Sequence, residues 1–257
     1  MGVFSRLFPA LQFILFCMLT AGCNSGTYVA THPYAPDLRQ AGDAEIAGGA
    51  KLRFIGEIIC PEVDVGFSPI SHLGIMGSYR RDFKSTFSAG SGRQGSRQPY
   101  FGQELWEIGI GSYFKQDGDL FGFYGGYSNG WASRRDDYID MPYRKWNDDL
   151  DLKFHRFWLQ LQAFFPVTRG VHLGFVGRGS LHRFDEVSSP QNMPLEQDLT
   201  AQNYGLADAA VLIQVNGKYT QVLIHTGLSM PTHKELSEHA HLLFGIQLGL
   251  HRPRRQL

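Results

Sequence analysis

The sequence predicts an all-β fold: an antiparallel up-and-down β-barrel of about ten strands, of the transmembrane type. Three observations predict it. Apolar residues recur at every second position through most of the chain, which is the period of a β-strand. Most alternating segments are about 10 to 14 residues long, and a tilted strand needs about 9–11 residues to cross a hydrocarbon layer. The connections alternate between tight turns and long polar stretches, as in barrels that cross a membrane.

Composition and charge narrow the class of protein further. Of 257 residues, 30 are glycine, 13% are aromatic and 19% are charged. Such low charge with so much glycine and aromatic content is unusual for a cytosolic enzyme. The formal net charge is zero, so we expect no nucleic-acid partner bound by bulk electrostatics. No motif in the chain calls for a cofactor, and we expect none.

Residues 1–22 are predicted to form a lipoprotein signal peptide. Arg6 supplies the positive charge, and residues 7–19 form an apolar core that is too short to span a bilayer. The segment ends in LTAGC, which resembles the lipobox of bacterial lipoproteins, so we expect Cys23 to be lipidated. Asn24 follows that cysteine, and in lipoprotein sorting this favours the outer membrane over the inner one. The alternative is an ordinary secretory signal with a chance cysteine.

The mature chain divides into two parts. Residues 23–42 have no periodicity and are predicted to be the lipidated N-terminus and a tether, and residues 43–257 are the predicted barrel domain. We expect ten strands in the barrel, at residues 44–54, 58–67, 72–82, 104–115, 120–131, 153–166, 171–184, 206–215, 219–229 and 240–250. The Asp-Gly and Asn-Gly pairs at 117–118 and 216–217 are favoured in tight hairpins.

Long polar stretches separate the hairpins at the other end of the barrel. They are predicted at residues 83–103, 132–152 and 185–205, with a shorter one at 230–239. A membrane barrel directs its long loops outward and its short turns toward the periplasm. We therefore expect an extracellular or envelope ligand to bind at these loops, and outer-membrane lipid to surround the barrel. Ten strands also place both ends of the barrel on the short-turn side, where the lipid anchor would lie.

The apolar series of the alternation carries no charged residue. Its members are Trp106, Ile108, Ile110, Phe114, Phe121, Phe123, Tyr127, Trp131, Phe157, Leu159, Leu161, Phe165, Val171, Leu173, Phe175, Leu181, Val211, Ile213, Val215, Val222, Ile224 and Leu228. An Arg or Lys at mid-bilayer would cost about 2–4 kcal/mol. The series therefore suits contact with lipid.

The opposite series is rich in glycine and glutamine. Its members are Glu107, Gly109, Gly111, Gly122, Tyr124, Gly126, Arg156, Gln160, Gln162, Gly174, Arg178, Ser180, Gln221, His225, Gly227, Gly245, Gln247 and Gly249. Glycine weakens a strand unless crowding demands it, and a narrow lumen is crowded. We expect Glu107, Arg156, Arg178, Gln160 and Gln162 to form a polar cluster that plugs the lumen; the alternative is a slim pore lined by these charges.

Several stretches are distinctive: the lipobox, PYAP in the tether, VGFSPISHLGIMGSY at 65–79, FGFYGGYSNG at 121–130 and VLIHTGLSMP at 222–231. Together with the ten alternating strands, they resemble the small outer-membrane β-barrel-like lipoproteins of Gram-negative bacteria. The resemblance implies a lipid-anchored barrel in the outer membrane. It supplies no catalytic residues.

The sequence thus predicts a lipid-anchored outer-membrane barrel without enzymatic activity, in a structural, surface-interaction or narrow-pore role. The alternative is a periplasmic, lipocalin-like lipoprotein that binds an apolar ligand inside a soluble barrel. That alternative requires the opposite orientation, with the apolar face turned inward.

Two sets of residues could instead carry chemistry. His225, Ser229 and Asp208 are the residue types of a hydrolase. However, His225 and Ser229 lie four apart on one strand, which is about 13 Å at a rise of about 3.3 Å per residue, and this is beyond hydrogen-bond reach. We expect no metal site, and the weak candidates for one are His233, Glu238, His239 and His241.

Overall fold

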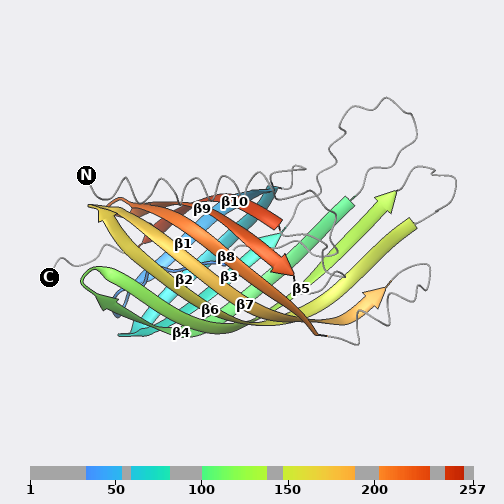
Figure 1. The fold of residues 1–257 in the computed structure, drawn as a ribbon, viewed down its shortest axis with the longest axis horizontal. Coiled ribbons are helices and arrows are strands. Elements are labelled where there is room, and N and C mark those ends of the chain that lie inside the picture. Colours follow the sequence, from blue (N-terminus) through green and yellow to red (C-terminus); the bar gives the residue numbers. More distant parts are fainter. Residues whose placement is uncertain are drawn as a thin grey trace, which may run out of the picture.

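The structure, a computed structural model, describes residues 33–53, 59–81, 100–137, 147–188, 203–231 and 241–251. Each strand pairs antiparallel with its neighbours along the chain, and β1 closes the barrel against β10 (Figure 1). The strands are β1 (Ala44–Arg53), β2 (Ile59–Ile70), β3 (Leu73–Arg81), β4 (Tyr100–Gln116), β5 (Asp119–Asp137), β6 (Asn147–Thr168), β7 (Val171–Ser188), β8 (Asn203–Asn216), β9 (Thr220–Pro231) and β10 (His241–His251). The predicted ten-stranded, up-and-down barrel is confirmed.

Tight turns join the strands at one end of the barrel, which we call the short-turn end. The β4–β5 turn shows why the sequence chooses this geometry. Asp117 has φ 52° and Gly118 has φ 96°. Positive φ at both central residues matches the right-handed twist of the flanking strands, and Asp-Gly tolerates it at low cost. The β6–β7 turn likewise places Gly170 at φ 88°.

At the opposite end, which we call the long-loop end, the predicted loops are too long, because the strands extend further than predicted. Strands β5, β6 and β7 contain 19, 22 and 18 residues and continue into the ranges predicted as loops. In Figure 1 the ends of β5 and β6 protrude beyond the shorter strands. Charged pairs occupy the outer face there, such as Lys153 with Glu186 and His155 with Asp185. The apolar alternation stops at this point while the ladder of backbone hydrogen bonds goes on, so periodicity alone ends the strands too early.

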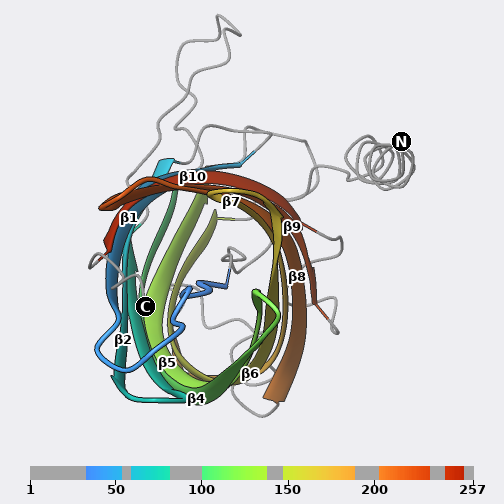
Figure 2. The same cartoon turned by 90° about the vertical axis from the view of Figure 1, so that its left-hand side faces the viewer.

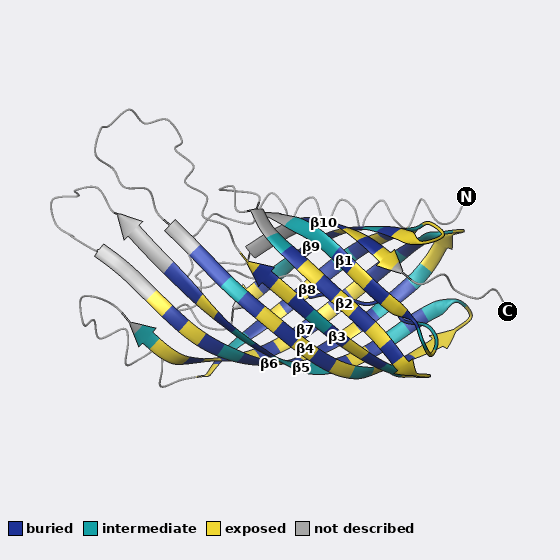
Figure 3. Cartoon of the chain, turned by 180° about the vertical axis from the view of Figure 1, so that it is seen from behind, coloured by how far each residue is buried: buried dark blue, intermediate teal, exposed yellow. Residues whose placement is uncertain are grey.

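The apolar series points outward, as the sequence predicts. Figure 3 shows exposed and buried residues alternating along the strands. On β6 the exposed side chains run from Phe157 (58% exposed) through Leu161 (64%) to Val167 (48%). Ten steps of about 3.3 Å at a tilt of about 40° give a band about 25 Å tall, the height of the apolar band of membrane barrels. A lipocalin-like barrel would need these side chains inside.

Residues 33–43 lie inside the barrel, and we call them the lumen strap. The strap forms the blue segment enclosed by the ring of strands in Figure 2. Tyr34 and Leu38 are 2% and 1% exposed. The sequence predicts a tether for residues 23–42, but the part of it that the structure describes is packed in the lumen. Lack of periodicity does not distinguish a free tether from a segment held by side chains of the surrounding strands.

The strap joins β1 at the short-turn end. There the Gly42 N–H donates to the Ser68 carbonyl at 2.7 Å, and the Ser68 N–H donates to the Asp43 carbonyl at 2.9 Å. Among the described residues, no helix is long and apolar enough to cross a bilayer.

Candidate functional site

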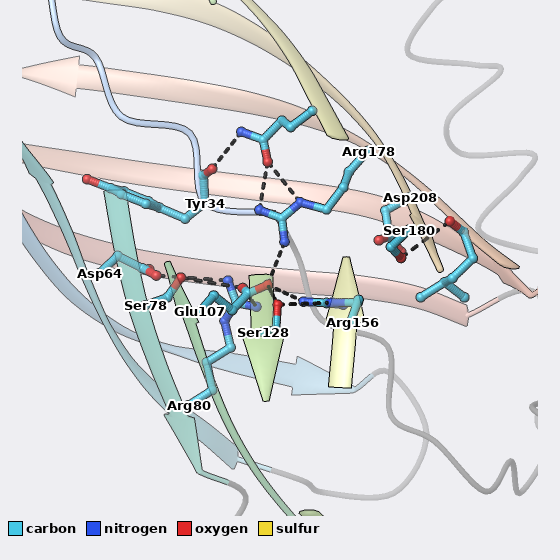
Figure 4. A network of polar contacts seen from close by, with 12 residues as sticks. Tyr34, Asp64, Ser78, Arg80, Glu107, Ser128, Arg156, Arg178, Ser180 and Asp208 are labelled. Atoms are coloured by element: carbon cyan, nitrogen blue, oxygen red, sulfur yellow. Dashed lines mark hydrogen bonds and ion pairs between the residues drawn. The ribbon is translucent and has the colours of Figure 1, made fainter. Parts of the chain in front are cut away.

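Four side chains from four strands meet in the middle of the lumen, and we call them the Glu107 cluster. Glu107 of β4 accepts from Arg80 of β3 at 2.7 Å, from Arg178 of β7 at 2.9 Å and from Arg156 of β6 (Figure 4). Ser128 of β5 adds a hydroxyl donor at 2.9 Å. Every charged member is at most 4% exposed. One carboxylate therefore joins five consecutive strands, β3 to β7, with β5 contributing its serine hydroxyl.

The ion pairs that extend from the Glu107 cluster contain as many guanidinium groups as carboxylates. Arg80 also contacts Glu62 through Nε at 3.2 Å and Asp64 through Nη2 at 3.9 Å. The Gln247 amide of β10 donates to Glu62 at 2.6 Å and to Asp64 at 2.5 Å. Three guanidinium groups thus face three carboxylates. Breaking a buried set of this kind is costly because each remaining charge loses its partner.

The structure brings together all five residues of the predicted lumen cluster. Arg156 and Arg178 both bind Glu107, and the Arg178 guanidinium donates to Gln160 Oε1 at 2.9 and 2.7 Å. Gln160 in turn donates to Gln162 at 3.1 Å. Sequence reasoning missed Arg80, Glu62 and Asp64. Their places in the alternation offered a signal, since Ser78 and Arg80 share one face of β3 and Glu62 and Asp64 share one face of β2.

Apolar and aromatic side chains fill the lumen on either side of the charges. The ring of Trp158 lies in it, and the Arg178 guanidinium carbon sits 4.3 Å from the ring centroid. Glycines make room for this ring: a Cβ added at Gly109 or Gly126 would come within 2.3 or 2.2 Å of its carbons. Glycine thus occurs at these positions of the lumen face because there is no space for a larger residue, as expected in a crowded lumen.

Two glutamines hold the lumen strap through its backbone. Gln160 Nε2 donates to the Tyr34 carbonyl, and Gln162 Nε2 donates to the Pro36 carbonyl, each at 2.8 Å. The Tyr34 hydroxyl donates to Glu45 of β1 at 3.1 Å. Burial, together with the neighbouring Glu45 carboxylate, raises the pKa of the Tyr34 hydroxyl well above its usual value. Tyr34 therefore stays protonated and acts as a donor.

The hydrolase candidates come together only in part. Ser229 donates to Asp208 at 2.5 Å across the β8–β9 pair. Both side chains are buried, and Ser229 has no exposed surface. His225 faces Gly245 of β10, where an added Cβ would lie 1.8 Å from its Nε2. A serine that donates a hydrogen bond directly to an aspartate, with no histidine between them, does not form the serine–histidine–aspartate arrangement of a hydrolase.

The remaining predicted sites fall mostly outside the described residues. His233, Glu238 and His239 lie there, and the side chain of His241 is not described. The described residues hold no group of three or more His, Cys, Asp or Glu side chains placed to bind a metal. Cys23 and residues 83–99, 138–146 and 189–202 of the predicted loops also lie outside them.

The fold and the filled lumen define a class of protein: a closed ten-stranded barrel with an apolar outer belt and a packed polar interior. No known family model and no curated protein sequence matches the chain. Solved structures of several outer-membrane proteins resemble the fold.

One is the outer membrane protease OmpT from Escherichia coli, at 10% identity and a TM-score of 0.46, covering 87% of this chain and 99% of that one. An outer membrane channel from Pseudomonas putida F1 is 10% identical with a TM-score of 0.38, covering 88% and 99%. The attachment invasion locus protein Ail of Yersinia pestis is 8% identical with a TM-score of 0.29, covering 82% and 99%. At these values the likenesses transfer no activity to this chain.

Proposed function

We propose that this chain is a lipid-anchored protein of the bacterial outer membrane whose barrel spans the membrane with a closed lumen. Its role is structural or is a surface interaction, without enzymatic activity. The single observation that carries the proposal is the outward apolar belt around an interior in which the described polar and apolar side chains and the lumen strap are buried.

The belt supports the location. Its outward side chains are uncharged along β6 from Phe157 to Val167, and charged pairs begin directly beyond Phe157 at the long-loop end. Burying such a band in acyl chains removes a large exposed apolar surface from water, whereas a soluble monomer rarely leaves a patch of this size uncovered.

The interior supports a closed lumen. Ten strands give a narrow barrel, and open aqueous channels require roughly 16 strands. In addition, the Glu107 cluster crosses the lumen from β3 to β7, and the strap fills the short-turn half. We therefore favour a plugged barrel over the slim pore that the same charges could line.

The lipid anchor is compatible with the strap. Tyr34 lies eleven positions after Cys23 in the sequence, and an extended chain of eleven steps reaches about 36–40 Å. That reach exceeds half the thickness of a bilayer core, which is about 15 Å. A lipidated Cys23 can therefore lie in a leaflet while Tyr34 lies in the lumen. The long-loop end, with the protruding ends of β5 to β7, remains for a partner or surface ligand.

Planar-bilayer recording tests the closed lumen. The full mature chain, refolded in detergent, should show a heat-dependent shift in gel mobility, which establishes that the barrel is folded. After insertion into a bilayer it should give no stable conductance. A reproducible ohmic conductance from the same folded sample would contradict the proposal and favour the narrow-pore role.

A further inference from the structure

The lumen strap is held as a bound peptide is held. The ten strands close the barrel among themselves, and residues 33–41 of the strap belong to none of their ladders. Gly42 and Asp43, where the strap joins β1, bond to the backbone of Ser68 in β2. Its contacts inside the lumen are made with side chains of the wall. The wall is therefore complete without the strap, and the strap occupies a site that the wall forms.

The wall recognises the backbone of an extended segment. Two amides from the same face of β6 donate to carbonyls two residues apart, those of Tyr34 and Pro36. On the other side, Glu45 accepts the Asp37 N–H at 3.2 Å and the Tyr34 hydroxyl at 3.1 Å. In an extended peptide, the carbonyls of alternate residues point to the same side. Fixed amide donors on one face of β6 therefore suit such a segment.

The wall also selects side chains. Gln214 Nε2 donates to the Asp37 carboxylate at 3.1 Å. Leu38 packs into an apolar cluster to which six strands contribute. Besides Ala35 of the strap, its members are Tyr113, Leu120, Phe164, Val176, Leu212 and Leu223. These contacts favour an acidic residue followed by an aliphatic one.

Two glycines shape the wall to the strap. A Cβ added at Gly66 would lie 2.8 Å from Pro36 Cβ and 3.0 Å from the Tyr34 hydroxyl. A Cβ added at Gly74 would lie 2.7 Å from the Tyr124 hydroxyl of the wall and 3.1 Å from Leu38 Cδ1 of the strap. Real Cβ atoms do not approach so closely without displacing a neighbour. The recess therefore fits proline and leucine at these two positions of the occupant.

The site opens at the short-turn end. Its inner end meets the layer that holds Trp158 and the Glu107 cluster, because Tyr34 packs with Trp158 and Tyr124, and Gln160 bridges Tyr34 to Arg178. At the other end, Ala41 is exposed. A path through this end does not cross the charged layer.

We propose that the lumen wall is a binding site for an extended peptide with the pattern aromatic-x-proline-acidic-aliphatic. Residues 34–38 occupy this site in cis, and this occupant can exchange for a peptide of the same pattern in trans. This inference goes beyond the closed barrel proposed above, which describes the occupied state.

Conversion of the cis occupant into a separate peptide tests the proposal. A protease recognition sequence is inserted between Ala41 and Gly42 of the full mature chain, at an exposed turn that should tolerate it. The refolded protein is cut, its folded state is checked by gel mobility, and a fluorescent peptide of residues 33–41 is added. Fluorescence anisotropy should rise to saturation with the cut protein. Binding to the uncut protein should be at least about tenfold weaker, because a tethered occupant competes at about millimolar effective concentration.

Two peptide variants give the matched comparison. Leu38→Ala in the peptide should weaken binding at least about 30-fold, since it empties a buried apolar position. Ala41→Ser, at an exposed position of the same peptide, should leave binding within about twofold. Absence of any uptake by the cut, folded protein overturns the proposal. Equal binding of the Leu38→Ala and unmodified peptides also overturns it.

A reversible disulfide between the strap and the wall tests where the peptide binds. Pro36→Cys with Gly66→Cys places two Cβ atoms about 2.8 Å apart before relaxation, and a disulfide needs about 3.8 Å, so a shift of about 1 Å suffices. In the oxidised, cut protein the strap should stay in place and block uptake of the peptide. Reduction should restore uptake. Equal uptake by the oxidised and reduced forms would place the peptide elsewhere and contradict the proposal.

Discussion

Replacing Glu107 by glutamine should destabilise the barrel strongly. The substitution Glu107→Gln keeps the shape of the side chain and removes its charge. Three guanidinium groups, those of Arg80, Arg156 and Arg178, contact this carboxylate, and all are buried. Removing one partner of a buried ion pair costs about 3–5 kcal/mol, mostly because the remaining charge is left uncompensated. We expect the free energy of unfolding to fall by at least this amount.

Glu104 offers a matched control on the same strand. It lies on the outer part of β4 and accepts from Tyr79 at 2.9 Å and from Trp131 at 3.2 Å, in contacts that are exposed. Glu104→Gln is the same chemical change and should cost less than about 1 kcal/mol. Urea titration in detergent, followed by tryptophan fluorescence, measures the loss in free energy of unfolding for each variant. Equal losses, or a loss below about 1 kcal/mol for Glu107→Gln, would refute the assignment of the cluster as the charge-balanced core of the lumen.

Three further predictions test the belt, the crowded lumen and the anchor. Leu161→Arg should lower the free energy of unfolding in lipid by about 2–4 kcal/mol, and Val167→Arg near the membrane edge by about 0–1 kcal/mol; similar costs would contradict a mid-bilayer place for Leu161. Gly126→Ala should lower the free energy of unfolding by about 1–3 kcal/mol because it overpacks the lumen. Gly177→Ala adds a Cβ that would meet nothing within 4 Å, so it should leave the free energy of unfolding almost unchanged in the same titration. Cys23→Ser should abolish incorporation of labelled palmitate in cells, and undiminished incorporation would rule out this cysteine as the anchor.

The fold was predictable because the strand alternation is strong throughout the apolar belt. On β10, Ile246, Leu248 and Leu250 point outward while Gln247 and its flanking glycines are buried. A period of two fixes which residues share a face, and the absence of charge on one face indicates which face meets lipid. The lumen cluster followed from the same pattern, since Glu107, Arg156 and Arg178 are the large charged groups of the other face.

The strap and much of the lumen packing were not predictable from the sequence. Tyr34 and Pro36 each bind an amide 126 residues away, and no local pattern reports contacts of such separation. Trp158 is an apolar residue on the polar face, so its place in the lumen depends on the space left by Gly109 and Gly126 on neighbouring strands. Such fits arise only when the strands are brought together in register.

Spin labels on neighbouring residues of β6 test the orientation of the barrel most directly. Leu161→Cys and Gln162→Cys, each carrying a nitroxide in protein reconstituted into liposomes, report collision with oxygen, which concentrates in lipid, and with a water-soluble nickel complex. Leu161 is 64% exposed and Gln162 is 3% exposed. The label at residue 161 should collide readily with oxygen and rarely with nickel, and the label at 162 rarely with either. A label at 161 that collides with nickel as freely as one in open water would contradict the account, because that face would then meet solvent.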